Sequence, residues 1–294
     1  MFPSLINHLK KFNFIQNEPL SKHSTFRVGG VAKYFYDTEN IDDVPELIAW
    51  AKSKPVPYFI LGGGSNVLFK DSGFDGLVVK ISADKISLDP KGVLAEAGAK
   101  MAEVARFACA NDFSGLEEFS SIPGTIGGAV YGNAGCFSKD IGSALLRAWI
   151  LRDDKIVSVK NDYFDFKYRW SKLKNTHEVV LKVLLKTSAG SCDKSRMDEI
   201  LKLRKEKQPW GLSAGSFFKN PGSTPETSAG YLIEKCGLKG EKVGGAQISS
   251  KHANFIINMG SATSEDILDL ADCAKKAVKK QFDIELEPEV RIIG

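Results

Sequence analysis

The sequence predicts a protein of mixed α and β structure, divided into two or three compact units. The chain has 294 residues, more than one hydrophobic core comfortably organises. Apolar patterns that suit strands alternate with patterns that suit helices along most of its length, and this order is typical of α/β units. A run of small polar residues at 188–191 offers a linker between a larger and a smaller part.

The N-terminal part begins with a polar, partly helical lead-in over residues 1–20. Strands are then expected at residues 31–36, 58–61 and 77–81, with a helix at 41–52 that Asn40 caps. Glycines directly follow the second of these strands. A strand–helix–strand order with such a turn indicates an α/β unit.

The middle of the chain continues with strands at 93–97 and 179–185 and a helix at 101–111. A hairpin is predicted to pair residues 147–151 with 155–159 across Arg152-Asp153-Asp154. The smaller part has helices at 193–207 and 264–282 and a terminal strand at 285–293. The expected domains are 1–20, 21–190 with lobes of about 21–81 and 82–190, and 191–294.

Composition excludes several classes of protein. The net charge is only +4, and the lysines are interspersed with acidic residues, so a solvated surface is favoured over a nucleic-acid site. The five cysteines are far apart and lack Cys-x-x-Cys spacing, which argues against a disulfide framework or a zinc site. The four histidines are isolated, so no metal site is expected. Without an apolar run that suits a signal peptide or a membrane span, the expected location is the cytoplasm.

Two glycine-rich segments are the first candidates for chemistry. In Gly62-Gly63-Gly64-Ser65-Asn66, backbone N–H groups can converge without Cβ obstruction, as a pyrophosphate requires; the alternative is a tight turn. Residues 122–135 interleave glycines with Ile, Val and Ala, which lets the backbone lie flat against a large planar ligand. The alternative is a close-packed helix interface.

Two further segments carry polar groups. Residues 215–221 offer Ser, Lys and Asn beside a proline, which suit anion binding or proton delivery but also an ordinary strand-to-turn transition. In the predicted terminal strand, Glu287, Glu289 and Arg291 share one face by the period of two. A buried carboxylate near an arginine suits catalysis, and a surface ion pair is the alternative.

In this order, these segments resemble the UDP-N-acetylenolpyruvoylglucosamine reductases of bacterial cell-wall synthesis, from about Lys22 to Gly294. The early motifs alone are similar to the wider group of FAD proteins related to vanillyl-alcohol oxidase, and the later ones narrow the resemblance to the reductase. The segments that carry it are 24–30, 61–68, 115–135, 168–171, 215–221, 252–256 and 289–291.

The resemblance implies an α+β fold, in which a two-lobed FAD-binding domain of the vanillyl-alcohol-oxidase type precedes a smaller α/β substrate-binding domain. It implies an enzyme that uses NADPH and non-covalently bound FAD to reduce UDP-N-acetylglucosamine enolpyruvate to UDP-N-acetylmuramate. A monomer without nucleic-acid or membrane partners is expected. The implied cofactor-binding residues are Gly62, Gly63, Gly64, Ser65, Asn66, Pro123, Gly124, Thr125, Gly127, Gly128, Ala129, Asn133 and Ala134.

By the same resemblance, Ser216 is the proton donor, and Arg169 and Glu289 support the enol-like intermediate. A guanidinium can engage a carboxylate with two hydrogen bonds, and a well-placed hydroxyl can deliver a proton. The implied substrate-binding residues are Lys219, Asn220 and Asn254.

The chain departs from the family pattern near the expected flavin. Ser121 stands where the family commonly has glycine, and Cys136-Phe137-Ser138 stands where it commonly has Ala-Tyr-Gly. The short distance between Arg169 and Ser216 indicates the shorter family type, which has a more open substrate pocket. Two rival functions are an FAD-dependent sugar or alcohol oxidase and a non-catalytic nucleotide-sugar binding module.

Overall fold

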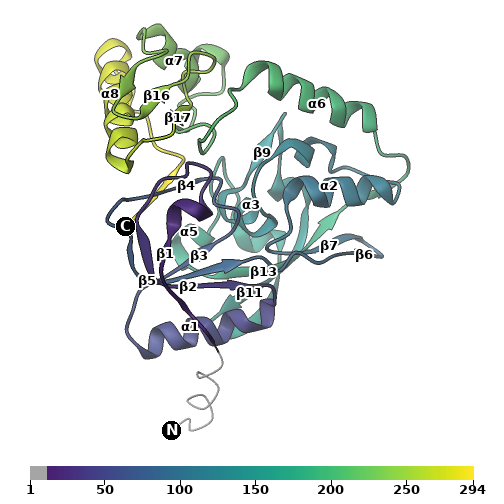
Figure 1. Cartoon of the computed structure of the whole chain (residues 1–294). Coiled ribbons are helices and arrows are strands. Elements are labelled where there is room, and N and C mark those ends of the chain that lie inside the picture. The colour runs from purple at the N-terminus through teal and green to yellow at the C-terminus, as the bar shows by residue number, and fades with distance from the viewer. Residues whose placement is uncertain (1–11) are drawn as a thin grey trace. The chain divides into compact units, whose positions relative to one another are not determined.

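A computed structural model describes residues 12–294 of the chain (Figure 1). The described residues form two compact units, and the chain passes between them repeatedly. The first unit holds the residues up to Gln16, Tyr34–Gly63 and Gly76–Lys202, and the second holds Asn17–Lys33, Gly64–Asp75 and Leu203–Gly294. The domain boundaries expected from the sequence stay predictions.

The larger sheet of the first unit is antiparallel, with strand order β12-β11-β13-β7-β6. Its strands are β12 (Lys155–Lys160), β11 (Leu145–Arg152), β13 (Val179–Lys186), β7 (Gly92–Glu96) and β6 (Ile86–Asp89). The predicted hairpin is confirmed, but Arg152 pairs with Lys155, so the turn is only Asp153-Asp154. Both aspartates have positive φ, 49° and 60°, as the twist of a two-residue hairpin requires.

A four-stranded sheet has the order β1-β2-β5-β3. Its strands are β1 (Ile15–Pro19), β2 (Val31–Thr38), β5 (Phe74–Ile81) and β3 (Tyr58–Leu61). Because β1 is a strand, the predicted helical lead-in is wrong over its described residues; residues 1–11 lie outside the described residues. The predicted helix at 41–52 begins as a 3₁₀ turn, η2 (Ile41–Asp43), before α1 (Val44–Ser53), and Asn40 Oδ1 caps it by accepting from Asp42 N at 3.1 Å.

One hydrophobic core fills the first unit. Apolar side chains of α1, α2 (Met101–Ala110) and α3 (Ile126–Gly132) join those of β5, β7, β11 and β13 in it. The remaining elements of this unit are β8 (Phe113–Ser114), η3 (Glu117–Ser121), β9 (Gly135–Cys136), β10 (Lys139–Asp140), α4 (Ile141–Ala144), η4 (Asn161–Phe164), α5 (Leu173–Thr176) and β14 (Ser188–Ala189).

A disulfide joins Cys109 and Cys192 in the first unit. The cysteine spacing argued against disulfides, and this pair shows why spacing alone misleads. The two residues are 83 positions apart, yet their Cα atoms lie 5.0 Å apart, because the end of α2 lies beside the segment that precedes α6 (Lys194–Lys207). Cys136, Cys236 and Cys273 are not disulfide-bonded.

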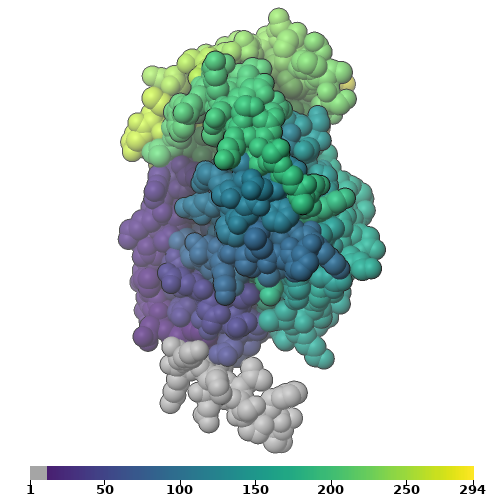
Figure 2. All heavy atoms as spheres, turned by 90° about the vertical axis from the view of Figure 1, so that its right-hand side faces the viewer, coloured from purple at the N-terminus to yellow at the C-terminus, as the bar shows by residue number. Residues whose placement is uncertain are grey.

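Helix α6, predicted at 193–207, is largely exposed (Figure 2). Met197 and Ile200 are its only buried residues. Its other side chains are mostly charged, which suits a helix that packs through one narrow stripe. Across residues 12–294, no helix has the length and hydropathy needed to cross a bilayer.

The second unit is built around α7 (Ala229–Lys235), α8 (Ser264–Phe282) and a small antiparallel sheet. This sheet consists of β15 (Lys242–Val243), β16 (Ala246–Ile248) and β17 (Ile256–Asn258), and α8 contacts all three strands (Figure 1). The sequence located α8 correctly. Its buried apolar residues are Ile267, Leu270, Ala271, Ala274 and Val278, which recur at helical spacing. The unit also contains the 3₁₀ turns η1 (Leu20–His23) and η5 (Pro225–Thr227).

The predicted terminal strand at 285–293 is wrong over most of its length. Only β18 (Arg291–Ile293) is a strand, and it pairs in parallel with β4 (Val67–Phe69). Pro288 has no backbone N–H, so it cannot donate a hydrogen bond to a neighbouring strand. A continuous strand therefore cannot form through this position. Pro288 forms a single bridge with Phe218, so the expected alternation of Glu287, Glu289 and Arg291 along one strand does not apply.

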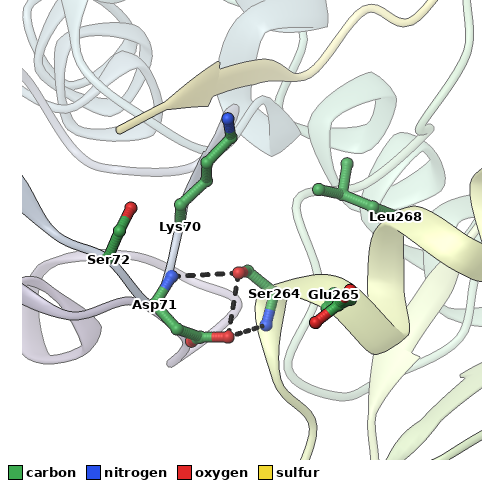
Figure 3. A pocket seen from close by; sticks show the side chains of 6 residues that line it. All are labelled: Lys70, Asp71, Ser72, Ser264, Glu265 and Leu268. Carbon is green, nitrogen blue, oxygen red and sulfur yellow. Dashed lines mark hydrogen bonds between the residues drawn. The ribbon is translucent and has the colours of Figure 1, made fainter.

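The start of α8 is tied to the loop that follows β4. The carboxylate of Asp71 accepts hydrogen bonds from Ser264 N at 2.8 Å and Ser264 Oγ at 2.9 Å, and Asp71 N donates to Ser264 Oγ at 3.0 Å (Figure 3). This junction borders an open pocket that contains none of the predicted site residues. An acidic group at a helix N-terminus both caps it and complements its dipole.

We predict that Asp71→Ala lowers the free energy of unfolding by about 1–2 kcal/mol, because it removes two hydrogen bonds at the start of α8. Urea unfolding followed by circular dichroism measures this change. Asp75→Ala is the matched control, since the Asp75 side chain is 86% exposed and forms a surface ion pair with Lys33. Equal effects of the two substitutions would contradict the assignment.

Candidate active site

The two glycine segments contact each other in the first unit. A Cβ on Gly62 would lie 2.4 Å from Oγ1 of Thr125, and a Cβ on Gly63 would lie 3.1 Å from Cα of Gly124. A Cβ on Gly62 would displace the Thr125 hydroxyl, whereas a Cβ on Gly63 would press on the backbone of Gly124. Glycine at both positions lets the two segments pack closely.

The end of the first glycine segment belongs to the second unit. Gly64 has φ +65°, and a Cβ there would lie 2.0 Å from the carbonyl oxygen of His23. Its own carbonyl oxygen accepts from Thr25 N at 3.0 Å and from Thr25 Oγ1 at 3.3 Å. Gly64 is thus the position of this segment where a left-handed backbone conformation demands glycine.

The second glycine segment leads into α3. Gly127 N donates to Ala97 O at 2.9 Å, and a Cβ on Gly127 would meet the Cβ of Ala97 at 3.0 Å. The α3 helix ends at Asn133, whose φ is +46°. The Asn133 amide donates to Asp140 Oδ2 and Lys167 O and accepts from Gly142 N, so its described bonds hold the protein rather than a ligand.

Unsatisfied polar groups gather at the start of the second glycine segment and in the two residues before it. Among the described residues, six buried side-chain nitrogen or oxygen atoms have no hydrogen-bond partner, and the hydroxyls of Ser120, Ser121 and Thr125 are three of them. A buried hydroxyl without a partner costs about 1–3 kcal/mol. Three such groups beside a glycine cradle fit a polar, planar cofactor such as FAD. The sequence had marked Ser121 only as a departure from the family pattern.

Arg169 lies in the first unit and has φ +53°. A bridge between Lys167 and Trp170 closes the turn around it, and Lys174 Nζ donates to its carbonyl oxygen at 2.7 Å. Its guanidinium lies 5.4 Å from the centre of the Tyr168 ring. A positive φ is uncommon for a residue with a long side chain. Where it does occur, it is often at a functional site.

The second unit brings Ser216 and Glu289 together through main-chain pairing. Glu289 N donates to Phe217 O at 2.8 Å. On the other side, Phe217 N donates to Asn254 O at 2.7 Å, and Ser216 bridges Phe255. The segment that carries Ser216 is therefore held between two others, one of which carries Glu289.

Asn66 extends this arrangement. Its Nδ2 donates to Glu289 O at 3.2 Å, and its carbonyl oxygen accepts from Arg291 N at 3.1 Å. Sequence reasoning had assigned Asn66 to the cofactor alone. No sequence signal marks the link, because it joins residues 223 positions apart.

The three predicted substrate-binding residues also have partners within the second unit. Lys219 Nζ pairs with the carboxylate of Glu287. Asn220 Oδ1 accepts from Ala229 N at 3.1 Å, at the start of α7, and Asn254 bonds the backbone of Phe218. Their roles toward the substrate stay predictions.

His252 is a titratable group that sequence reasoning passed over. Its Nδ1 accepts from Asn254 N at 3.3 Å, and its ring packs against Phe255. Burial lowers the pKa of His252, and the charge of Lys239 lowers it further, although Glu234 opposes this. The described residues contain no group of three or more His, Cys, Asp or Glu side chains that suits a metal ion.

We predict that His252 makes the protein less stable in acid. Its folded-state pKa lies below the unfolded value of about 6.5, so between these values the unfolded chain binds a proton that the folded chain does not. Stability should fall as the pH drops below about 6.5, and His252→Asn should reduce this loss while keeping an acceptor for Asn254 N. Thermal unfolding from pH 5 to 8 tests this, with the exposed His177→Asn as control. Parallel pH curves for wild type and His252→Asn would refute it.

We predict that Gly63→Val weakens FAD binding by about tenfold or more. The reason is the 3.1 Å approach of Gly124 to a Cβ at this position, because overpacking of this kind costs about 1–3 kcal/mol. The ratio of flavin to protein absorbance after gel filtration measures retention. Gly132→Val is the control, because a Cβ there meets no atom within 4 Å. Equal retention in both variants would disprove the close-approach argument.

Comparisons with known proteins cover nearly the whole chain. Residues 207–293 match the model of the UDP-N-acetylenolpyruvoylglucosamine reductase C-terminal domain, and residues 32–145 match that of an FAD binding domain. UDP-N-acetylenolpyruvoylglucosamine reductases from Caldanaerobacter subterraneus and Pediococcus pentosaceus are 38% and 39% identical to the chain; the alignments cover 97% and 100% of it and 95% and 99% of those proteins.

The crystal structure of the UDP-N-acetylenolpyruvylglucosamine reductase from Thermus caldophilus superposes with a TM-score of 0.80 at 32% identity, covering 96% of this chain and 98% of that one. The predicted fold class is thereby confirmed, including its FAD-binding domain. With this identity sustained over nearly the whole length, the chain belongs to the UDP-N-acetylenolpyruvoylglucosamine reductase family.

Proposed function

We propose that this chain reduces UDP-N-acetylglucosamine enolpyruvate to UDP-N-acetylmuramate, and that Arg169, Ser216 and Glu289 are its catalytic residues. The chain is an FAD-dependent oxidoreductase that takes hydride from NADPH and acts in peptidoglycan precursor synthesis. The observation that supports the residue assignment is the main-chain hydrogen bond between Glu289 and Phe217, the residue next to Ser216, in the second unit.

The reaction poses two problems for the protein. When bound, FAD carries hydride from NADPH to C3 of the enolpyruvyl group. Negative charge then develops next to a carboxylate, and a proton must reach C2. The protein must therefore hold a cation near the carboxylate and a proton donor near C2.

Ser216 is the proposed proton donor. A serine hydroxyl is a weak acid, so it acts only when it is held close to the carbon that it protonates. Main-chain pairing restrains Ser216 on the side of Phe255, and Phe217 links it to Glu289. Glu289 is proposed to stabilise the enol-like form of the substrate by hydrogen bonding.

Arg169 is the proposed partner of the substrate carboxylate, because a guanidinium can bind it with two parallel hydrogen bonds. Lys219 and Asn220 are proposed to bind the UDP-sugar. The Lys219 ammonium suits a diphosphate, whose charge would compete with the exposed Glu287 for it. A cytoplasmic location and a monomeric state, expected from the sequence, complete the proposal.

We predict that Ser216→Ala leaves reduction of the flavin by NADPH unchanged and slows its reoxidation by enolpyruvyl substrate by several orders of magnitude, because only the second step needs the proton. Anaerobic stopped-flow absorbance near 450 nm measures both steps. The exposed Ser223→Ala should alter neither. Equal slowing of the two steps by Ser216→Ala would reject the assignment.

We predict that Glu289→Gln also acts on reoxidation alone, slowing it by about 10²-fold or more, since a neutral amide cannot replace the carboxylate. The matched control is Glu285→Gln, because the Glu285 side chain is 83% exposed on the same segment. Unchanged turnover in Glu289→Gln would leave that segment with a structural role only. An absence of reoxidation by enolpyruvyl substrate in the wild type would refute the proposed function itself.

A further inference from the structure

The side chain of Asn254 makes a double contact with one backbone residue. Its Nδ2 donates to Phe218 O at 2.8 Å, and its Oδ1 accepts from Phe218 N at 2.9 Å. The residue is only 2% exposed. Both polar ends of the amide thus serve the segment that carries Ser216.

The backbone pairing around Phe218 explains why this contact is needed. Phe218 forms a β-bridge with Pro288. The hydrogen bonds of this pairing lie on either side of the bridge: Lys219 N donates to Glu287 O, and Glu289 N donates to Phe217 O. In this antiparallel pattern the N–H and C=O of Phe218 itself point away from Pro288. They are buried, and Asn254 satisfies both.

No other side chain of similar size reproduces this pair of bonds. Aspartate offers acceptors to Phe218 N but presents a carboxylate oxygen to Phe218 O, which then lacks a donor. Serine is shorter. A buried peptide group that loses its partner costs about 1–3 kcal/mol, so the segment would shift to find another.

We propose that Asn254 is a positioning residue, which fixes the backbone of Phe218 and thereby holds Ser216 and Glu289 in register for proton transfer. It acts through the peptide groups of the catalytic segment rather than by contact with the substrate. This inference rests on the proposed roles of Ser216 and Glu289.

A matched control lies in the same unit. Asn258 is 6% exposed, and its side chain also bonds only to backbone groups in the described bonds. Its Nδ2 donates to Phe26 O at 2.9 Å, and its Oδ1 accepts from Gly260 N at 2.8 Å and Ala262 N at 3.0 Å. These bonds involve neither the Ser216 segment nor the Glu289 segment. Asn258→Asp therefore disturbs a comparable buried amide away from the proposed chemistry.

The experiment compares Asn254→Asp and Asn258→Asp in the full chain with FAD bound. Thermal unfolding gives stability, and anaerobic stopped flow gives the two flavin steps over a range of substrate concentrations. Both variants should be less stable. Asn254→Asp alone should slow reoxidation by about 10–100-fold, since small displacements of reacting groups have effects of this size. Its reduction by NADPH and its substrate dissociation constant should stay within about threefold of wild type.

Three outcomes would overturn the proposal. Reoxidation within twofold of wild type in Asn254→Asp would deny a positioning role. A rise in the substrate dissociation constant that accounts for the whole rate loss would make Asn254 a substrate contact. Equal slowing in Asn258→Asp would reduce the effect to general destabilisation.

A second variant covers the case in which Asn254→Asp does not retain FAD. Asn254→Ser keeps a small polar group and leaves room for water, and it should show a smaller but selective loss of reoxidation. Failure of both variants to fold, while Asn258→Asp folds, would assign Asn254 a folding role and overturn the proposal. If Ser216→Ala is slow and Asn254→Asp is normal, this inference fails alone. If Ser216→Ala is normal, the assignment of Ser216 fails together with this inference. The proposed function fails only if the wild type shows no reoxidation by enolpyruvyl substrate.

Discussion

Close packing of the two glycine segments is the constraint on which the proposed cofactor site depends. An added Cβ would crowd the Thr125 hydroxyl at Gly62 and the backbone of Gly124 at Gly63. Two segments about sixty positions apart thereby lie against each other with few side chains between them. The unpartnered hydroxyls beside it fit a cofactor that supplies the missing hydrogen bonds.

In the second unit, asparagine side chains complete the hydrogen bonding of irregular backbone segments. The Ser216 and Glu289 segments are too irregular to form a continuous ladder, partly because Pro288 cannot donate. Asparagine amides complete the pairing: Asn254 serves Phe218, and Asn66 serves Glu289. An asparagine carries a donor and an acceptor on a short side chain, so it can replace a neighbouring strand at one residue. These amides hold the Ser216 and Glu289 segments where regular secondary structure ends.

Regular elements were predicted well because their signals are local. The α8 helix carries its apolar stripe, its acidic first turn and its terminal lysines within one stretch of chain. The hairpin of β11 and β12 turns on adjacent aspartates that tolerate positive φ. The terminal strand failed because one proline interrupts it, and β1 was missed because its burial pattern does not alternate.

The sequence by itself determined the family and the cofactor class, because glycine runs and polar motifs follow one another in a fixed order along the chain. Only the tertiary structure decided the Cys109–Cys192 disulfide, the hydrogen bond from Asn66 to Glu289 and the hydrogen bonds of the Asn254 side chain with Phe218. Each of these joins residues 36 to 223 positions apart. Such contacts follow from how the backbone folds, and no local pattern of residues encodes them.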